Sequence, residues 1–339
     1  MNPLPFPAPT RTRISHPAHA PAFALPAAIA LLAILAFAQA PAHAQRGGGS
    51  FVAIDAHSTH ILAQQNHSRR TPIHGYARLA TAVVTLDWST RTGTDMALVI
   101  TVPGEVSGIV LNPMGLRPGD RISLRDLVYS VVLGSDDAAA MTLAATVGRD
   151  MLMRRQRSGD PIAEFVREMN NLARQEAMTR TRFLSPVAIP PGRRGAGNTS
   201  VGDLALLGRY AMSRPAFRFY SSQLERNVTI QRGGASSGFR VTNANTLAST
   251  RNIDGVMVLR PQPGQPAMAL LSARRQPEVT PLADGSTRLY PRRVVVVVAG
   301  MDSPEHFAGR LTEGAWAAFD QWTAEGRPHD PARLLRRSR

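Results

Sequence analysis

The chain has 339 residues, of which 43% are hydrophobic and 19% are charged, with 27 Gly and 26 Pro. This composition excludes a disordered chain, a collagen and a coiled coil, because none of these carries such an apolar content without a repeat. The absence of cysteine excludes disulfides, a thiol nucleophile and thiolate metal ligands. All 39 basic residues are arginines, so mechanisms that need a lysine, such as a Schiff base or a Ser–Lys pair, are excluded as well.

The first 44 residues are expected to form a signal peptide rather than part of the fold. Arg11 and Arg13 supply a positive N-terminal region, residues 27–38 are apolar, and residues 42–44 (Ala-His-Ala) have the small-x-small pattern of a cleavage site. The apolar run is too short to cross a bilayer core of about 30 Å as a helix. We therefore expect cleavage after Ala44, export to the periplasm and no transmembrane anchor once the leader is removed. Retention of the leader as an anchor is the alternative.

The mature chain is strongly basic. The leader removes two arginines and no acidic residue, so 37 arginines stand against 24 acidic residues and the formal charge is +13. A charge of this size favours anionic partners. The arginines are scattered rather than interleaved with aromatic residues, and the protein is expected to be exported, so we expect no nucleic-acid partner. Anionic polymers of the cell envelope fit these observations better.

Apolar residues predict strands near both ends of the mature chain and helices between them. The predicted elements, in chain order, are a hairpin at 50–63, a helix at 77–86, a strand at 96–102, two helices within 124–147 that are separated at 134–137, helices at 161–178 and 201–212, strands at 228–230, 239–241, 255–259, 267–273 and 293–299, and a closing helix at 305–323. This order predicts an α+β fold in which an antiparallel sheet packs with a helical cluster. The domain is expected to span residues 50–323, after a linker at 45–49 and before a basic tail at 324–339.

Several short local sequences lie along the chain in a specific order and at specific spacings. They are Ile54-Asp55-Ala56, Ile61-Leu62 with Asn66, Leu116-Arg117-Pro118-Gly119-Asp120, Phe165 with Met169-Asn170, Thr181-Arg182-Phe183, Asp203-Leu204-Ala205, Asn243 with Asn245 and Leu247, and Gly255. Together they resemble the serine D-alanyl-D-alanine carboxypeptidases, the low-molecular-weight penicillin-binding proteins of peptidase family S11. The resemblance implies the penicillin-binding, β-lactamase-like transpeptidase fold and a place in peptidoglycan metabolism.

The chemistry of that family rests on three motifs, and the first is Ser-x-x-Lys, in which the serine is acylated while the lysine takes its proton. Counting from Asn66 and back from Thr81 places the serine position at Gly75 and the lysine position at Arg78. Glycine offers no nucleophile, and an arginine keeps its proton at physiological pH and cannot act as a base. A one-residue slip would place His74 at the serine position but would restore no lysine.

The second and third motifs are replaced as well. Ser-x-Asn falls on Gly134-Ser135-Asp136, which loses the hydroxyl and exchanges the amide for a carboxylate. Lys-Thr-Gly, with which the family binds the terminal carboxylate of its substrate, falls on Met257-Val258-Leu259. Because these three side chains are apolar, we expect the groove beside them to accept a protein or peptide segment by strand pairing rather than a free carboxylate.

Other candidate groups have structural interpretations. Residues 234–238 fit the G-x-S-x-G pattern, but a strand follows them instead of a helix, so we predict a hairpin turn. Ser135 stands beside Asp136 and Asp137, where no base is near and where the two carboxylates oppose an oxyanion, so we interpret this acidic pair as a helix cap. Tyr76 is a weak nucleophile, because an unperturbed tyrosine has a pKa of about 10. The histidines at 57, 60, 67 and 74 lack carboxylates at ligand spacing, and no metal or other cofactor is expected.

Two functions remain open. The first is a catalytically inactive relative of the carboxypeptidases that acts as a periplasmic cell-wall binding or scaffolding protein, with peptidoglycan or an envelope protein or peptide as its partner. The second is an active hydrolase, a carboxypeptidase of peptidoglycan peptides that uses residues outside the family motifs. The loss of the nucleophile and of the lysines favours the first.

Overall fold

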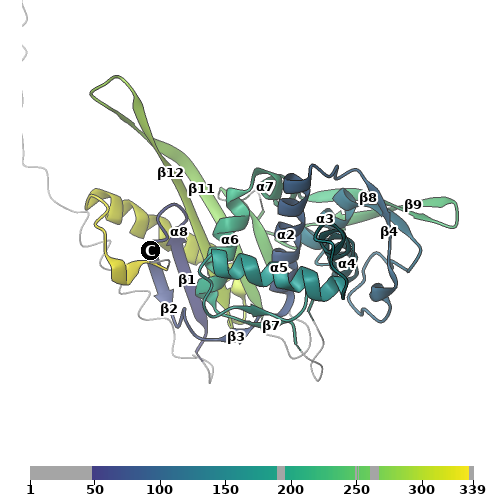
Figure 1. Cartoon of the computed structure of the whole chain (residues 1–339). Coiled ribbons are helices and arrows are strands. Elements are labelled where there is room, and N and C mark those ends of the chain that lie inside the picture. Colours follow the sequence, from purple (N-terminus) through teal and green to yellow (C-terminus); the bar gives the residue numbers. More distant parts are fainter. Residues whose placement is uncertain (1–47, 189–194, 249, 251, 260–266, 336–339) are drawn as a thin grey trace, which may run out of the picture. The chain divides into compact units, whose positions relative to one another are not determined.

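The computed structural model describes residues 48–188, 195–248, 250, 252–259 and 267–335, and for Val258 and Leu259 it describes the backbone alone. The expected signal peptide lies outside these residues. The described part contains an antiparallel sheet and a cluster of helices (Figure 1). The predicted α+β fold is therefore confirmed.

The largest sheet joins the two ends of the described chain. Its strand order is β10-β11-β12-β1-β2, and every pair of neighbours is antiparallel. The strands are β1 (Ser50–Asp55), β2 (Ile61–Gln65), β10 (Ile253–Leu259), β11 (Met268–Pro281) and β12 (Thr287–Ala299). Within the sheet β1 lies between β2 and β12, with Ser50 opposite Ala299. β10 lies at the other edge and pairs with β11 alone among the strands of this sheet.

Helices cover both faces of this sheet, which explains the continuous apolar run in β12. Side chains of a strand alternate between the two faces, so Val294, Val296 and Val298 join one buried cluster and Val295 and Val297 another. The first cluster contains the apolar side of α8 (Pro304–Ala324), and the second contains that of α6 (Val201–Ser213). A run without polar alternation is expected for a strand that is buried on both faces.

The remaining helices form the cluster that carries the first two motifs. They are α2 (Ala77–Thr92), α3 (Leu124–Val132), α4 (Asp137–Arg154), α5 (Pro161–Gln175) and the short α7 (Pro215–Ser221), with 3₁₀ turns η1 (His74–Tyr76) and η2 (Gly104–Val106). Side-chain caps fix where three of them begin, because Ser123, Asp136 and Asp160 each accept a backbone N–H of the first turn. Helix α4 approaches α5 closely at Gly148, where a Cβ atom would lie 2.0 Å from the Pro161 carbonyl oxygen.

Two smaller sheets complete the described part. One has the order β3-β7-β6 and the other the order β4-β5-β8-β9. Their strands are β3 (Thr71–Pro72), β4 (Val99–Thr101), β5 (Arg121–Ser123), β6 (Arg182–Phe183), β7 (Gly197–Thr199), β8 (Glu225–Arg232) and β9 (Ala235–Thr242). The turn between β8 and β9 is formed by Gly233 and Gly234, both with positive φ. The predicted hairpin turn therefore lies at the start of the G-x-S-x-G segment, and Ser236 lies in β9.

Strands β11 and β12 continue well beyond the sheet as a two-stranded ribbon (Figure 1), although the sequence predicted only residues 267–273 and 293–299. The prediction was too short because the extension is rich in charged residues and lacks the apolar alternation of a buried strand. Side chains on α8 support its base instead. Arg275 and Arg292 form ion pairs with Asp320, and the Arg275 guanidinium also lies over the Trp316 ring.

Residues that follow α8 fold back onto the domain as far as they are described. The Trp322 indole N–H donates to the Pro328 carbonyl, a 3₁₀ turn η3 (Pro331–Arg333) follows, and Leu334 pairs with His60 in an isolated bridge. The His60 ring stacks on Trp322. Within the described ranges, no helix combines the length and apolar character that a membrane span requires.

Candidate functional site

The first motif lies where η1 leads into α2. His74 has a φ of 46°, a left-handed conformation that non-glycine residues rarely adopt, and Gly75 and Tyr76 are buried. The Tyr76 hydroxyl donates to the Met257 carbonyl at 3.1 Å. Burial raises the pKa of Tyr76 well above its usual range, with Arg78 opposing the shift, so this hydroxyl is no phenolate nucleophile. The structure thus places the first-motif segment against the strand of the third motif.

Arg78, at the lysine position, is held in a buried ion pair. Its Nη1 donates to Asp137 Oδ1 at 2.6 Å, and the two side chains are 5% and 4% exposed. Burial raises the pKa of Asp137, and the Arg78 guanidinium opposes that shift by its charge and its hydrogen bond. Because arginine cannot give up its proton at physiological pH, the position predicted for the catalytic base holds a permanent cation and its counter-ion.

The second motif forms the tight connection between α3 and α4. The backbone N–H groups of Gly134 and Asp136 both donate to the Ser130 carbonyl, at 3.1 and 3.2 Å. Ser135 between them has a φ of 56°, and its buried Oγ has no hydrogen-bond partner among the described residues. No general base contacts this hydroxyl within the same ranges, which agrees with the structural interpretation of Ser135.

Asp136 caps α4 with one carboxylate oxygen only. Oδ1 accepts the Ala139 N–H at 2.9 Å, whereas Oδ2 is buried and has no hydrogen-bond partner in the described part of the chain. Desolvation raises the pKa of Asp136 to about 6, against the opposing effect of the backbone amides of Ala139, Met114 and Ala138. The predicted cap is present, and the carboxylate that replaces the family amide carries an unsatisfied oxygen.

Gly134, at the serine position of the second motif, lies in a space that a side chain would overfill. A Cβ atom there would lie 2.9 Å from Val241 Cγ1 and 3.0 Å from the Ser130 carbonyl oxygen. Val241 belongs to β9, so the strand occupies the place of the missing side chain. Restoring a serine at this position would require β9 or α3 to shift.

The third motif lies on β10, where Met257 is buried and pairs with Leu270 of β11. The backbones of Val258 and Leu259 pair with Ala269 and Met268, and their side chains lie outside the described part. Backbone φ angles of 155° at Gly255 and 86° at Val256 mark a distortion just before the motif. A buried methionine therefore occupies the position from which the family lysine would reach a carboxylate.

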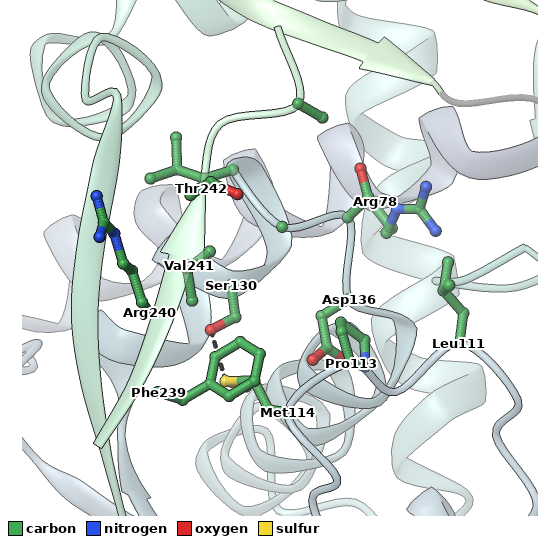
Figure 2. A pocket seen from close by; sticks show the side chains of 14 residues that line it. Arg78, Leu111, Pro113, Met114, Ser130, Asp136, Phe239, Arg240, Val241 and Thr242 are labelled. Carbon is green, nitrogen blue, oxygen red and sulfur yellow. Dashed lines mark hydrogen bonds between the residues drawn. The ribbon is translucent and has the colours of Figure 1, made fainter.

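A cavity of about 310 Å³ lies beside the second motif (Figure 2). It is enclosed by loop residues between 111 and 114, by residues 130–136, by residues 239–244 and by Arg78, and we call it the Asp136 cavity. Arg78, Gly134 and Asp136 line it, whereas Gly75 and Met257 do not. The structure thus brings part of the predicted site together around one cavity and leaves the rest at the Tyr76–Met257 contact.

The wall that β9 and the loop at 111–114 provide could not be predicted from the sequence. A signal was present in β9, where apolar Phe239 and Val241 alternate with polar Arg240 and Thr242. That alternation predicts a strand with one apolar face, but it does not say what the face covers. The loop lies more than a hundred residues earlier in the chain, and only the tertiary fold brings it opposite β9.

With the geometry in place, comparison with known proteins identifies the family. A family model described as D-alanyl-D-alanine carboxypeptidase, peptidase family S11, matches residues 37–257. The chain belongs to this family. Family members among curated proteins include a D-alanyl-D-alanine endopeptidase of Pseudomonas aeruginosa, 26% identical over 214 residues that make up 63% of each protein. D-alanyl-D-alanine carboxypeptidase DacD of Escherichia coli is 28% identical over 75% of this chain and 58% of its own length.

The matches thus span about three-fifths of the length of these two family members. Among solved structures, the DD-transpeptidase of Streptomyces K15 superposes with a TM-score of 0.63 at 20% identity, over 80% of this chain and 96% of its own. Penicillin-binding protein 6B of Escherichia coli gives 0.60 at 24% identity, over 78% and 76%. These two likenesses confirm the S11-type fold, and the family resemblance stated from the sequence is confirmed as well.

Proposed function

We propose that this chain is a member of the carboxypeptidase family that has lost acyl transfer and serves as a periplasmic binding or scaffolding protein of the cell wall. The observation that carries the proposal is the buried Arg78–Asp137 ion pair next to Gly75. Acyl transfer in the family needs a hydroxyl nucleophile and a lysine base at these two positions. The chain has a glycine and a paired arginine there.

The size of the expected loss supports the proposal. Removing the serine nucleophile alone lowers kcat about 10⁶-fold in a serine protease, and losses within one catalytic unit do not add. The further replacements at Gly134, Asp136 and Met257 therefore add little to this loss in rate. Their effect is that these positions supply no other group to act as nucleophile, base or carboxylate partner. Burial keeps Tyr76 protonated, so this neighbouring hydroxyl offers no such route either.

Binding remains compatible with the site, because β10 is an edge strand. An edge strand can pair with an extended peptide through its backbone. On the edge of β10 the Met257 carbonyl accepts the Tyr76 hydroxyl, so a peptide would pair beyond this position or displace the tyrosine. Peptidoglycan, or a peptide segment of an envelope protein, is the proposed partner.

Two assays on the purified mature protein test the proposal together. Intact-mass spectrometry after long incubation with benzylpenicillin should show no adduct, and a pentapeptide ending in D-Ala-D-Ala should release no D-alanine. Co-sedimentation with purified peptidoglycan sacculi should retain the protein in the pellet. A stoichiometric adduct or D-alanine release would overturn the inactive function and favour the hydrolase that uses other residues. Failure to bind either sacculi or envelope peptides would overturn the binding function.

A further inference from the structure

The Asp136 cavity is apolar on most of its surface. Phe239 and Val241 of β9 form one side, and Leu111, Met114 and Leu133 form the other. At about 310 Å³ it lies at the small end of the volumes of ligand pockets, roughly 300–1,000 Å³. Pro113, Arg240 and Thr242 on its rim are exposed, so the cavity opens to solvent.

One wall carries a polar group without a partner. The Asp136 side chain is 0% exposed, and its Oδ2 accepts no hydrogen bond from any described residue. Buried polar groups are almost always satisfied, and a buried carboxylate that lacks a partner raises the free energy of the folded protein. The Ser135 Oγ, on the same wall, is in the same condition. An apolar cavity with an unsatisfied carboxylate at its wall has the character of a binding site.

Among the charged residues that line the cavity, Asp136 is the one for which the described residues supply no counter-ion, although Arg78 Nε is also buried there without a hydrogen-bond partner. Arg78 is paired with Asp137, and Arg240 is hydrogen-bonded to Glu225 of the neighbouring strand. Figure 2 shows the guanidinium groups of Arg78 and Arg240 on opposite sides of the cavity. Each positive charge therefore already has its own carboxylate, and the complementary ligand for Asp136 is a single cation.

We propose that the Asp136 cavity binds an organic ammonium group on a short apolar stem, with Asp136 as its counter-ion. The ammonium would donate to Oδ2, which is the oxygen that the helix cap leaves unsatisfied, and because this oxygen is buried the Asp136 side chain must turn toward the cavity on binding. The stem would lie between Phe239, Met114 and Leu133. The inference goes beyond the proposed function, because it depends on neither the presence nor the absence of acyl transfer. The ammonium could be that of a free amine or that of a peptide side chain, and the two sources are distinguished by experiment.

The protonation of Asp136 gives this interaction a pH dependence. Burial raises the pKa of Asp136 to about 6, so the carboxylate form prevails at pH 7.5 and the acid form below pH 5. Arg78 of α2 and Arg240 of β9 line the same cavity, and the neighbouring Asp137 of α4 acts on Asp136 by its charge. Ammonium binding requires the carboxylate, so the affinity should fall as the pH drops through about 6.

Isothermal titration of the mature protein with benzylamine and with benzyl alcohol, at pH 7.5 and at pH 5, tests the proposal. Benzyl alcohol is the neutral isostere, and acetyl-Gly-Lys-Gly-amide presents an ammonium on a peptide side chain. We expect benzylamine to bind at pH 7.5 roughly tenfold to a hundredfold more tightly than benzyl alcohol, as expected for a hydrogen bond to a charged group. Tighter binding of the peptide than of benzylamine would assign the ligand to a peptide, and the reverse order to a free amine.

Asp136→Asn should abolish the preference for the amine, because the amide oxygen can still cap α4 while the charge is gone. Asp203→Asn is the matched control, since Asp203 is also a buried aspartate near the N-terminus of a helix, with a burial-raised pKa, and it lies on α6 and is not among the residues that line the cavity. The affinity of the Asp203→Asn variant for benzylamine should equal that of the wild type. Ala244→Phe places a large side chain on the cavity wall and should therefore prevent binding of every probe. This variant tests the cavity independently if Asp136→Asn does not fold. Equal binding of amine and alcohol, an unchanged preference in Asp136→Asn, or no binding of any probe to the wild type would each overturn the proposal.

Discussion

The hydroxyl of Tyr76 donates to the carbonyl oxygen of Met257 across 3.1 Å, although the two residues are 181 positions apart in the chain. This bond joins the segment to which the sequence assigns the first family motif to the strand to which it assigns the third. Tyr76 is fully buried, so the bond is shielded from water. Here the two motif segments are tied to each other by a structural contact.

Tyr76→Phe should therefore lower the free energy of unfolding by about 1–2 kcal/mol, because the Met257 carbonyl loses its buried donor. Urea denaturation followed by circular dichroism measures this change. Tyr129→Phe is the matched control, since Tyr129 is equally buried but none of the side-chain hydrogen bonds described for this protein involves its hydroxyl. Equal stability of Tyr76→Phe and Tyr129→Phe would show that the bond contributes nothing.

Gly75→Ser should remain unreactive toward benzylpenicillin, as judged by intact mass. Arg78 is paired with Asp137 and keeps its proton, so it cannot serve as a base for the new hydroxyl. Adding Arg78→Lys supplies an amine that can serve as a base, but the second and third motifs would still be absent. An acyl-enzyme in the single variant would support position 75 as the nucleophile position and would contradict the conclusion that the paired Arg78 leaves the site without a base.

The steric environment of Gly134 makes a full reversion harder still. Gly134→Ser would place its Cβ against Val241 and the Ser130 carbonyl, and overpacking of this kind costs about 1–3 kcal/mol. Shortening Val241 to alanine in the same variant should recover part of the stability. Such a recovery would show that Gly134 and Val241 are mutually adapted.

Arg78→Met should destabilise the protein by about 3–5 kcal/mol, because it leaves the Asp137 carboxylate buried without its partner. The double variant Arg78→Met with Asp137→Leu should lose much less, since both charges are then removed. Thermal denaturation of the two single variants and the double variant forms a cycle that measures the coupling. Additive losses would show that the ion pair has no energetic role.

The raised pKa of Asp136 predicts that the free energy of unfolding falls as the pH rises. Its pKa in the folded protein, about 6, lies above the ordinary value of 3.8, so the folded state binds the proton more tightly than the unfolded chain. The contribution to stability is therefore fully present below about pH 4 and is lost as the pH rises through about 6, by roughly 1–3 kcal/mol.

Measuring the free energy of unfolding between pH 4 and pH 7.5 tests this sign. The difference between wild type and Asp136→Asn should shift in favour of the variant as the pH rises. Asp137 and Asp203 also have burial-raised pKa values, so the comparison with the variant, rather than the wild-type curve alone, isolates Asp136. A difference that is independent of pH would contradict the assignment.

Much of this architecture could be predicted from the sequence, because the periodicity of apolar residues reports burial directly. The helices on either side of residues 134–137 and the closing helix α8 follow from spacing and from an aspartate cap. The ribbon formed by β11 and β12 could not be predicted in full, because its outer part is held by backbone pairing and its base by arginine contacts with α8, and neither leaves an apolar pattern.

The geometry of the candidate site could not be predicted from the sequence, and the assignment of its residues to the family motifs stays a prediction. Counting along the chain located Gly75 and Arg78, yet nothing in the local sequence indicates that Asp137, 59 residues later, neutralises the arginine. The Asp136 cavity was missed for a similar reason. Its walls come from segments whose contact depends on the tertiary fold, and an unsatisfied oxygen is a property of three-dimensional surroundings alone.

The position of β1 between β2 and β12 has a consequence for how the chain folds. Residue 50 pairs with residue 299, so the central strands of the sheet meet only after the whole intervening chain is available. The helical cluster depends on nearer contacts and can form earlier, whereas pairings across such a separation close slowly. A polypeptide ending at residue 257, where the family match stops, would lack β11 and β12 and so leave both β10 and one side of β1 without a neighbour. β12, the last described strand to be synthesised, therefore pairs with β1, the first described strand, and completes the sheet around it.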